Sequence, residues 1–549
     1  MKYRSWLKAL AVATLVTVSA GSAWACTVFM VGKNATVDGS VMTSHTCDGW
    51  YDQRVQIIPG GPHKAGEMVP IHKNICYQTR PKAELQLVGE IPQVPETYTY
   101  FHVGYPFMNE KSVVMGEYTW GGRDENLCEE KGWMMIEQLQ ALALQRAATA
   151  RDAIRIMGEL AEKYGYADGG EAVSVADKNG EVWLFEICGP GPLWTPESGK
   201  PGAIWVAQRI PDDGFAMGAN RARIAEIEWD NKNDFMYSSN IRSFAQDMGW
   251  WKDGEPFVFH KIYNPNPYGS PYYQQRREWR AYTLIEPSLK LDPNLAEQYP
   301  LVIKPSKKLS VQDLMAVYRD NLEGTPYDLT TGLAAGPFGT PTRYATPKGV
   351  RPENRKGNDW DRSISLFRCS YSFVSQVRPD MPDPIAAVLW FGEDQPSTTL
   401  YMPIYAGTTE VPRPYAVGKR HEFDRDSAWW AWNFVGNWAD LKFSHMIQDI
   451  RQVQQQLEGK YFLELPQADK KALEYYQKDP KLAVDFVNRF VNENLTEGLD
   501  TWWNLAWHLV GKYHDGMVIS PDGSFSTPGY PTWWLEKVGF GDTDAEPKH

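Results

Sequence analysis

The sequence predicts an α+β protein in which β-sheets are covered by helices, with a helical extension at the C-terminal end. Strand patterns begin at Thr27, a helical pattern begins at Thr149, and strand patterns return before residue 208. From Ser427 to Tyr513 the apolar residues recur at helical spacing. We therefore predict a main domain at 26–426 and a helical extension at 427–549 that packs on it.

The N-terminal segment is typical of a secretory signal peptide. Three basic residues among the first eight precede an apolar run at 9–18 and small residues at 19–25. The run is shorter than the roughly 20 residues that span a bilayer. We expect cleavage after residue 25, which makes Cys26 the first residue of an exported chain, periplasmic or secreted. Bacterial lipoproteins are also cleaved before a cysteine, although they favour a leucine-like residue at the position held here by Ala23.

The net charge and the positions of the cysteines argue against several classes of protein. Removal of the three basic residues with the signal peptide takes the net charge from −12 to −15, which disfavours nucleic acid as a partner. No later segment is long and apolar enough to span a membrane. The six cysteines are scattered without metal-site spacing, so we predict no metal and no cofactor. Disulfide pairing and oligomeric state stay open.

The predicted strands at 27–32 and 40–44 form a β-hairpin that starts at Cys26. A two-residue turn would place Tyr51 opposite Cys26, whereas a wider loop would place Asp48 there. We favour the wider loop. The choice matters because a slip of one residue moves every side chain to the other face.

The rest of the main domain alternates regular and irregular segments. Thr149 is a candidate N-cap with Asp152 three residues later, before an amphipathic helix. Further strands are predicted at 172–176, 181–187 and 202–208. The stretch 254–352 is rich in Pro, Tyr and Gly, and we expect long surface loops there.

An N-terminal cysteine carries a nucleophile and a base in one residue. The free α-amine has an unperturbed pKa of about 7.7 to 8.0, so it can accept the thiol proton near neutral pH. The thiolate then attacks a carbonyl to form an acyl-enzyme that water hydrolyses. Cys26 is therefore the candidate nucleophile.

Several blocks resemble the cysteine dipeptidases related to dipeptidase A and the secernins, a family of N-terminal-nucleophile hydrolases. In order, these blocks extend over most of the chain. They are Cys26–Ser40, Met108–Glu110, Gly116–Arg123, Trp205–Asp213, Asn220–Ile224, Trp279–Ser288, Gln376–Asp383 and Ser427–Asn433.

The resemblance implies a four-layer αββα sandwich and hydrolysis of dipeptides or related small amides. It implies that Asp48 holds the α-amine and thiol of Cys26, and that Asn109 donates a hydrogen bond to the oxyanion. It also implies that Asn220 contacts the α-amine or the substrate. The alternatives are a solvated turn aspartate for Asp48 and structural turn or capping roles for the two asparagines.

The sequence departs from the family at His45, where many relatives carry arginine. A neutral histidine lowers the pKa of a neighbouring thiol less than a fixed cation does. His45 is either a residue that tunes the site or a structural strand residue. Arg280 is a candidate for the missing positive charge.

Three functions are compatible with the sequence. The first is an exported cysteine dipeptidase acting on dipeptides. The second is an amidase or acylase acting on a non-peptide N-acyl compound by the same chemistry. The third is a non-catalytic periplasmic ligand-binding protein of the same fold, which the retention of the candidate site residues disfavours.

Overall fold

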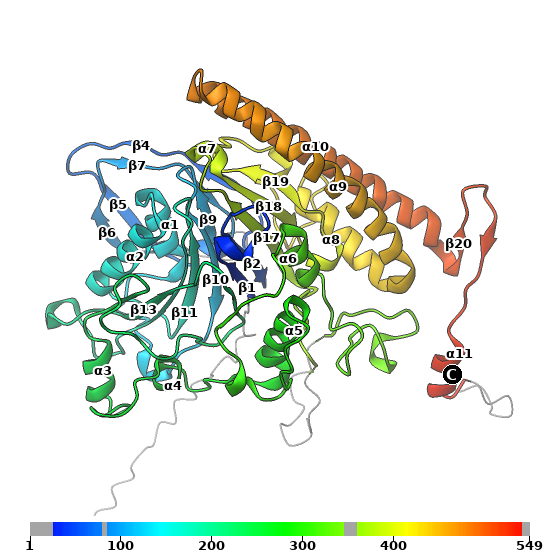
Figure 1. The fold of residues 1–549 in the computed structure, drawn as a ribbon. Coiled ribbons are helices and arrows are strands. Elements are labelled where there is room, and N and C mark those ends of the chain that lie inside the picture. Colours follow the sequence, from blue (N-terminus) through cyan, green and yellow to red (C-terminus); the bar gives the residue numbers. More distant parts are fainter. Residues whose placement is uncertain (1–25, 79–84, 345–359, 541–549) are drawn as a thin grey trace, which may run out of the picture.

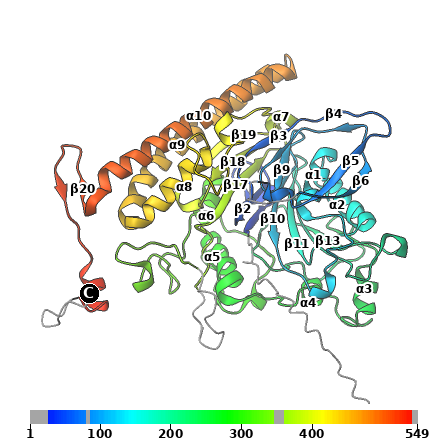
Figure 2. The same ribbon diagram turned by 180° about the vertical axis from the view of Figure 1, so that it is seen from behind.

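A computed structural model describes residues 26–78, 85–344 and 360–540 of the 549. Its centre is a pair of β-sheets that pack face to face, with helices against their outer sides (Figures 1 and 2). The predicted signal peptide at 1–25 lies outside the described residues. The mixed helix and strand content agrees with the predicted α+β class.

The first sheet has seven strands and carries the start of the described chain. Every pairing within it is antiparallel. Its strands, in spatial order, are β16 (Val302–Ile303), β14 (Phe215–Gly218), β1 (Val28–Val31), β2 (Met42–Asp48), β17 (Cys369–Val377), β18 (Ala387–Glu393) and β19 (Met402–Tyr405).

The second sheet has eight strands and is also antiparallel. Its strands, in spatial order, are β15 (Phe235–Tyr237), β13 (Ile204–Arg209), β12 (Val182–Cys188), β11 (Glu171–Ala176), β10 (Val114–Thr119), β9 (Pro106–Asn109), β8 (Tyr100–His102) and β3 (Gln56–Ile58). Three two-stranded ribbons complete the strands: β4 (Gly61–Pro62) with β7 (Glu96–Thr97), β5 (Met68–Lys73) with β6 (Gln86–Pro92), and β20 (Val518–Ile519) with β21 (Phe525–Ser526).

Helices cover the outer side of each sheet. α1 (Ile136–Arg146) and α2 (Ala150–Tyr164) lie against the eight-stranded sheet, whereas α6 (Val311–Tyr318), α8 (Ala428–Ala439), α9 (Phe443–Tyr476) and α10 (Pro480–Tyr513) lie against the seven-stranded sheet. The remaining helices are α3 (Ile241–Asp247), α4 (Phe259–Tyr263), α5 (Arg276–Ile285), α7 (Asp383–Ala386) and α11 (Thr532–Lys537).

The two sheets approach closely at two glycines. A Cβ added to Gly116 on β10 would lie 2.2 Å from the backbone oxygen of Ser44 on β2. A Cβ added to Gly218 on β14 would lie 2.1 Å from the ring of Tyr118 on β10. Only glycine permits this separation of the backbones.

The predicted hairpin is present, but its register differs by one residue from the one we favoured. Met30 pairs with Thr43, and Thr27 forms a bridge with Thr46. This register places Cys47, not Asp48, opposite Cys26. Because side chains alternate between the faces of a strand, Asp48 lies on the other face from Cys47.

Other sequence predictions have mixed outcomes. α2 begins after Thr149, whose side chain accepts a hydrogen bond from the backbone N–H of Asp152, as predicted. The three later strands also appear, as β11, β12 and β13. The prediction of loops for 254–352 is wrong in part, because α4, α5, α6 and β16 lie there. The spacing of their apolar residues was obscured by the neighbouring Pro and Gly residues.

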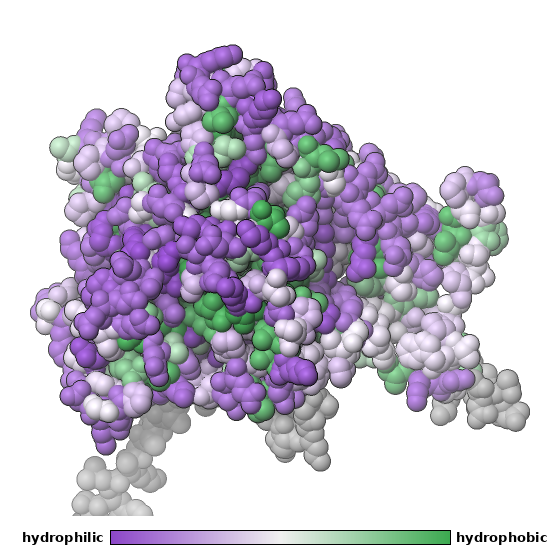
Figure 3. All heavy atoms as spheres, viewed as in Figure 1, coloured by the Kyte–Doolittle hydropathy of each residue, from purple (hydrophilic) through white to green (hydrophobic). Residues whose placement is uncertain are grey.

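The C-terminal helical prediction is confirmed for α8, α9 and α10. The long helices α9 and α10 run side by side and contact β19 (Figure 1). The rings of Trp432 on α8 and Trp502 on α10 stack with centroids 5.6 Å apart. Figure 3 shows mostly hydrophilic residues along the visible side of this helix pair. None of the helices in the described ranges combines the length and apolar character that crossing a membrane requires.

Candidate active site

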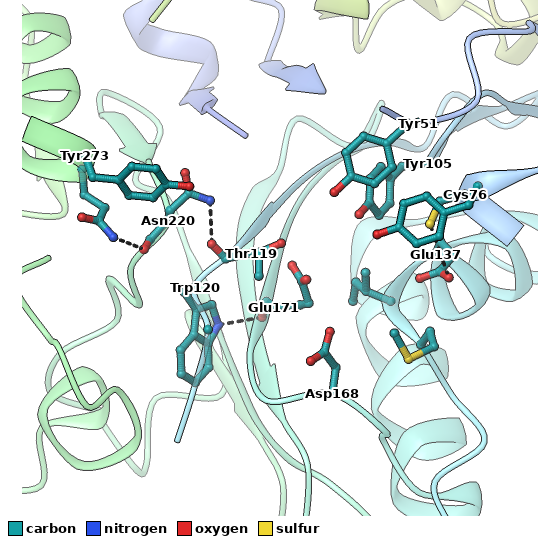
Figure 4. Close-up of a pocket in the computed structure, with 15 residues that line it drawn as sticks. Tyr51, Cys76, Tyr105, Thr119, Trp120, Glu137, Asp168, Glu171, Asn220 and Tyr273 are labelled. Atoms are coloured by element: carbon teal, nitrogen blue, oxygen red, sulfur yellow. Dashed lines mark hydrogen bonds between the residues drawn. The ribbon is translucent and has the colours of Figure 1, made fainter. Parts of the chain in front are cut away.

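A cavity of about 320 Å³ opens beside the start of β1. This volume is at the small end of the range for small-molecule sites. Figure 4 shows the side chains that face it, which include Tyr51, Tyr105, Glu171 and Asn220. Cys26 is not among the lining residues, but several lining residues contact its immediate neighbours.

Cys26 is fully buried, at the end of the hairpin where the two sheets meet. Its sulfur, a ring nitrogen of His45 and a carboxylate oxygen of Glu117 all lie within 4.8 Å of one another. His45 comes from β2 and Glu117 from β10 of the opposite sheet. The structure therefore groups a thiol, an imidazole and a carboxylate, which is the set that activates a cysteine nucleophile in other hydrolases.

The imidazole of His45 is held by a carboxylate and by aromatic rings. Its Nε2 lies 3.4 Å from Oε2 of Glu117, and its ring meets those of Tyr105, Tyr371 and Phe373 edge-on, at 5.6 to 5.9 Å between centroids. Burial lowers the pKa of His45, but Cys26 and Glu117 outweigh burial and raise the pKa to about 9. A protonated His45 and a thiolate at Cys26 thus stabilise each other, which favours the tuning role of His45 over the structural one.

The same surroundings act on the thiol of Cys26. Burial raises its pKa well above the usual value, and Cys47 and Glu117 add to that effect. Coulombic attraction and hydrogen bonding from His45 lower the pKa. A buried thiolate at Cys26 therefore depends on a protonated His45.

The three grouped side chains could also hold a metal ion. Thiolate, imidazole and carboxylate are ligands that suit Zn²⁺. We predicted no metal from the sequence. His45 is 19 positions after Cys26, and Glu117 is 72 positions after His45, which matches no known spacing of metal ligands.

A buried arginine that the sequence analysis did not single out contacts the backbone of the candidate nucleophile. Nη1 of Arg277 on α5 donates to the carbonyl oxygen of Cys26 at 3.1 Å and to Oγ1 of Thr27 at 2.9 Å. Its Nη2 donates to Oδ1 of Asn220 at 2.7 Å. Burial, with Arg362 nearby, lowers the pKa of Arg277 to about 9, so it is cationic at neutral pH.

Asp48 is fully buried and forms an ion pair with Arg362, whose Nη2 lies 2.5 Å from Oδ2. Thr46 donates to the same oxygen at 3.2 Å. The other oxygen, Oδ1, accepts no hydrogen bond from the described residues. Burial raises the pKa of Asp48, while Arg362 and Arg277 oppose that rise. Asp48 is therefore a buried group beside the Cys26 strand, not a solvated turn residue.

Asn220 lines the cavity and is fixed by its neighbours. Its Nδ2 donates to the carbonyl oxygen of Thr119 at 2.7 Å, and Gln274 donates to its backbone oxygen at 3.2 Å (Figure 4). Its φ is +63°, a left-handed conformation in which asparagine is enriched. The segment that follows Asn220 is fixed to α5, because Arg221 and Arg223 both form ion pairs with Glu278 on that helix.

The structure does not bring Asn109 into the site. Its Nδ2 donates to the carbonyl oxygens of Leu144 and Ala147, both at 2.8 Å. Its Oδ1 accepts from the backbone N–H groups of Lys111 and Val113. Both amide hydrogens are thus committed to joining the β9–β10 turn to the end of α1, and the oxyanion role expected for Asn109 is wrong for this arrangement. The contacts of Asn109 instead fit the alternative, a structural role in a turn.

Arg280 is likewise structural. It makes a bidentate ion pair with Asp320, with Nη2 2.6 Å from Oδ2, and donates to the carbonyl oxygen of Glu323. It lies three residues after Arg277 on α5, and Arg277, not Arg280, is the arginine that contacts Cys26.

Comparison with known proteins now identifies the family. Residues 25–456 match the sequence model of peptidase family C69. The chain belongs to peptidase family C69. A probable dipeptidase of Latilactobacillus sakei is 27% identical over 403 residues, which cover 71% of this chain and 76% of the relative. A probable dipeptidase of Salmonella dublin is 25% identical (70% and 82% covered), and dipeptidase A of Lactobacillus helveticus is 23% identical (76% and 82% covered).

The family membership confirms the resemblance found in the sequence, but two site residues were missed. Glu117 stands inside a family block, Gly116–Arg123, and an acid within such a block was the signal that could have marked it. Arg277 lies two residues before the block that begins at Trp279. Its spacing of one helical turn from Arg280 could have marked it as a second candidate.

Replacement of Asn109 should affect stability rather than catalysis in this C69 peptidase. Asn109→Ala leaves two carbonyl and two N–H groups without their partner in a buried turn, and each such group costs about 1 to 3 kcal/mol. We expect urea denaturation to give a free energy of unfolding at least about 2 kcal/mol lower. The kcat of the folded protein should not change; a lower kcat at unchanged stability would restore the oxyanion role.

Two arginines on α5 form a matched pair for a second test. Arg277→Gln removes donors to Cys26 and Asn220, so we expect kcat/KM for a dipeptide to fall at least about tenfold. Arg280→Gln removes one ion pair to Asp320 and should lower the melting temperature while leaving kcat/KM unchanged. Equal losses of kcat/KM in the two folded variants would contradict the assignment of Arg277 to the site.

Proposed function

We propose that the protein is an exported cysteine dipeptidase of the N-terminal-nucleophile class, with Cys26 as its nucleophile. The observation that carries the proposal is the position of Cys26, buried at the head of the first strand within 4.8 Å of the His45 and Glu117 side chains. The two facing sheets with outer helices support the αββα sandwich of this class. The names of the C69 relatives support a dipeptide substrate.

The reaction begins with transfer of the Cys26 thiol proton to the α-amine that signal cleavage frees. The sulfur attacks the peptide carbonyl, and the resulting ammonium returns its proton to the departing amine of the second amino acid. Water then hydrolyses the thioester and releases the first amino acid. The second amide hydrogen of Asn220, which lines the cavity, is the candidate donor to the oxyanion.

Asp48 and Arg277 position the new N-terminus. Arg277 holds the carbonyl oxygen of Cys26, which fixes the backbone from which both the amine and the thiol project. Oδ1 of Asp48, which has no hydrogen-bond partner among the described residues, is the acceptor proposed for the α-amine. Its carboxylate would favour the protonated amine after the thiol gives up its proton.

His45 and Glu117 support the thiolate from the other side. A protonated imidazole beside the sulfur compensates for the loss of hydration that burial imposes. Glu117 stabilises that protonated ring, as the carboxylate of a catalytic triad does. His45 thus takes the part that arginine plays in many relatives.

Export follows from the proposed signal peptide at 1–25. The chain with an uncleaved signal has an amide at Cys26 in place of the amine, and so has no N-terminal base. Export and activation are then one event, because cleavage creates the group that accepts the thiol proton.

A glycine added before Cys26 should abolish most of the activity. The extra residue converts the α-amine to an amide that cannot accept a proton near neutral pH, so we expect a loss of roughly 10²- to 10⁴-fold in kcat. The measurement is hydrolysis of Ala-Ala by the mature and extended proteins, with N-terminal sequencing of each and Cys26→Ser as the inactive control. Full activity of the extended protein would rule out the α-amine as base.

His45→Gln should make Cys26 a weaker nucleophile without removing the thiol. Glutamine keeps a polar side chain but cannot carry the positive charge, so the thiol pKa should rise. Because His45 is protonated below its pKa of about 9, the loss should be largest near neutral pH and smaller above pH 9. The readout is iodoacetamide alkylation of the Cys26 peptide by mass spectrometry across pH. Identical profiles for variant and wild type would assign His45 a structural role only.

A further inference from the structure

One wall of the cavity is acidic. Glu137, Asp168 and Glu171 all line it, and Figure 4 shows their carboxylates directed toward a common space. Glu137 and Glu171 are only 2% and 3% exposed. In the part of the chain that the structure describes, no Lys or Arg side chain forms an ion pair with any of the three. The wall therefore gathers three acidic groups without a resident cation.

Glu171 in particular is an incompletely satisfied group. Its Oε2 is buried and has no hydrogen-bond partner among the described residues. Burial raises the pKa of Glu171 well above its usual value, and the nearby Glu117 and Asp168 add to this rise. Burial likewise raises the pKa of Glu137 to about 7. A cation entering the cavity would relieve both the desolvation and the repulsion.

The acidic wall begins next to the candidate nucleophile. Glu171 on β11 pairs with Thr119 on β10, and Glu117 lies two residues before Thr119, on the same face of the sheet. Glu117 in turn belongs to the group around Cys26. In a dipeptide, one carbon separates the α-ammonium nitrogen from the carbonyl carbon that the thiol attacks. A substrate with its carbonyl at Cys26 and its ammonium group directed into the cavity would extend that group along β10 toward Glu171.

The opposite wall has a different character. Asn220, Tyr273 and Gln274 face the cavity there, and none of them is a carboxylic acid. The cavity therefore has acidic groups on one wall and none on the opposite wall. This asymmetry orients a substrate that carries a positive group at one end.

We propose that Glu171, flanked by Asp168 and Glu137, is the subsite for the free α-ammonium group of the substrate. This inference rests on the proposed dipeptidase function and names the feature that the substrate must carry. An N-acyl compound has no positive charge to offer these carboxylates and brings extra bulk against them. The subsite therefore selects unblocked dipeptides over the N-acyl compounds that an acylase of the same chemistry takes.

Glu171→Gln separates this role from a structural one. With Ala-Ala as substrate, we expect KM to rise about ten- to hundredfold, because a charge-assisted hydrogen bond to the ammonium is lost. The kcat should change little. Hydrolysis of N-acetyl-Ala-Ala, which we expect to be slow in the wild type, should not fall. Glu197→Gln, which makes the same change of charge at an exposed position, should leave both substrates unaffected.

Binding without turnover supplies an independent readout. In the mature Cys26→Ala protein, calorimetry should detect Ala-Ala but not N-acetyl-Ala-Ala, and adding Glu171→Gln should weaken binding of Ala-Ala about ten- to hundredfold. The free energy of unfolding should not fall with Glu171→Gln, because the variant removes a buried acid that has no partner at Oε2.

The outcomes distinguish this inference from the proposed function. If neither compound is hydrolysed by the wild type, the dipeptidase proposal fails, while selective binding of Ala-Ala that depends on Glu171 still supports the subsite. Equal binding or equal hydrolysis of the free and acetylated compounds would overturn the subsite. So would a Glu171→Gln protein that retains the wild-type KM and affinity for Ala-Ala.

Discussion

The pairing register of β1 with β2 is the constraint on which the candidate site depends. It sets Cys26 opposite Cys47 and directs the Cys26 side chain into the space between the two sheets, beside His45 and Glu117. A register one residue longer would turn the thiol toward the outer side. In its observed place the thiol is fully buried, and the charged groups next to it, His45 and Glu117, act on its pKa in opposite directions.

Those charges occupy both faces of the hairpin. Between the sheets, Glu117 and the sulfur favour a protonated His45. On the outer face, Arg277 and Arg362 neutralise Asp48 and fix the backbone of Cys26. The thiol of Cys26 and its α-amine, the proposed base, are thus each surrounded by a separate group of side chains. This division lets each group be tested without removing the other.

Local features of the sequence predicted local structure well, and long-range contacts poorly. Thr149 identified the start of α2 because an N-cap is a contact within one turn. The hairpin was found, but its register depends on pairings with β14 and β17 that sequence spacing does not reveal. Asn109 was misassigned because an asparagine that closes a turn is indistinguishable by residue type from one that binds an oxyanion.

The charged residues of the site illustrate the same limit of sequence-based prediction. Arg280 was named because it lies in the family block, and Arg277, just before that block, was not considered. The two are one helical turn apart, and only Arg277 contacts Cys26. Glu117 and Glu171 were not singled out in the sequence. Their importance comes from the facing sheet and from the cavity, which only the assembled fold brings together.

The close approach of the sheets at Gly116 and Gly218 has a consequence for how this protein can change. Each glycine lies across from a residue of the other sheet with no room for a methyl group, so these contacts fix the separation of the two sheets between which Cys26, His45 and Glu117 meet. Tyr273 and Gln274 line the cavity on the wall away from the acidic residues, and neither takes part in these sheet contacts. The cavity can therefore be reshaped at these two positions while the separation of the sheets around Cys26 is preserved.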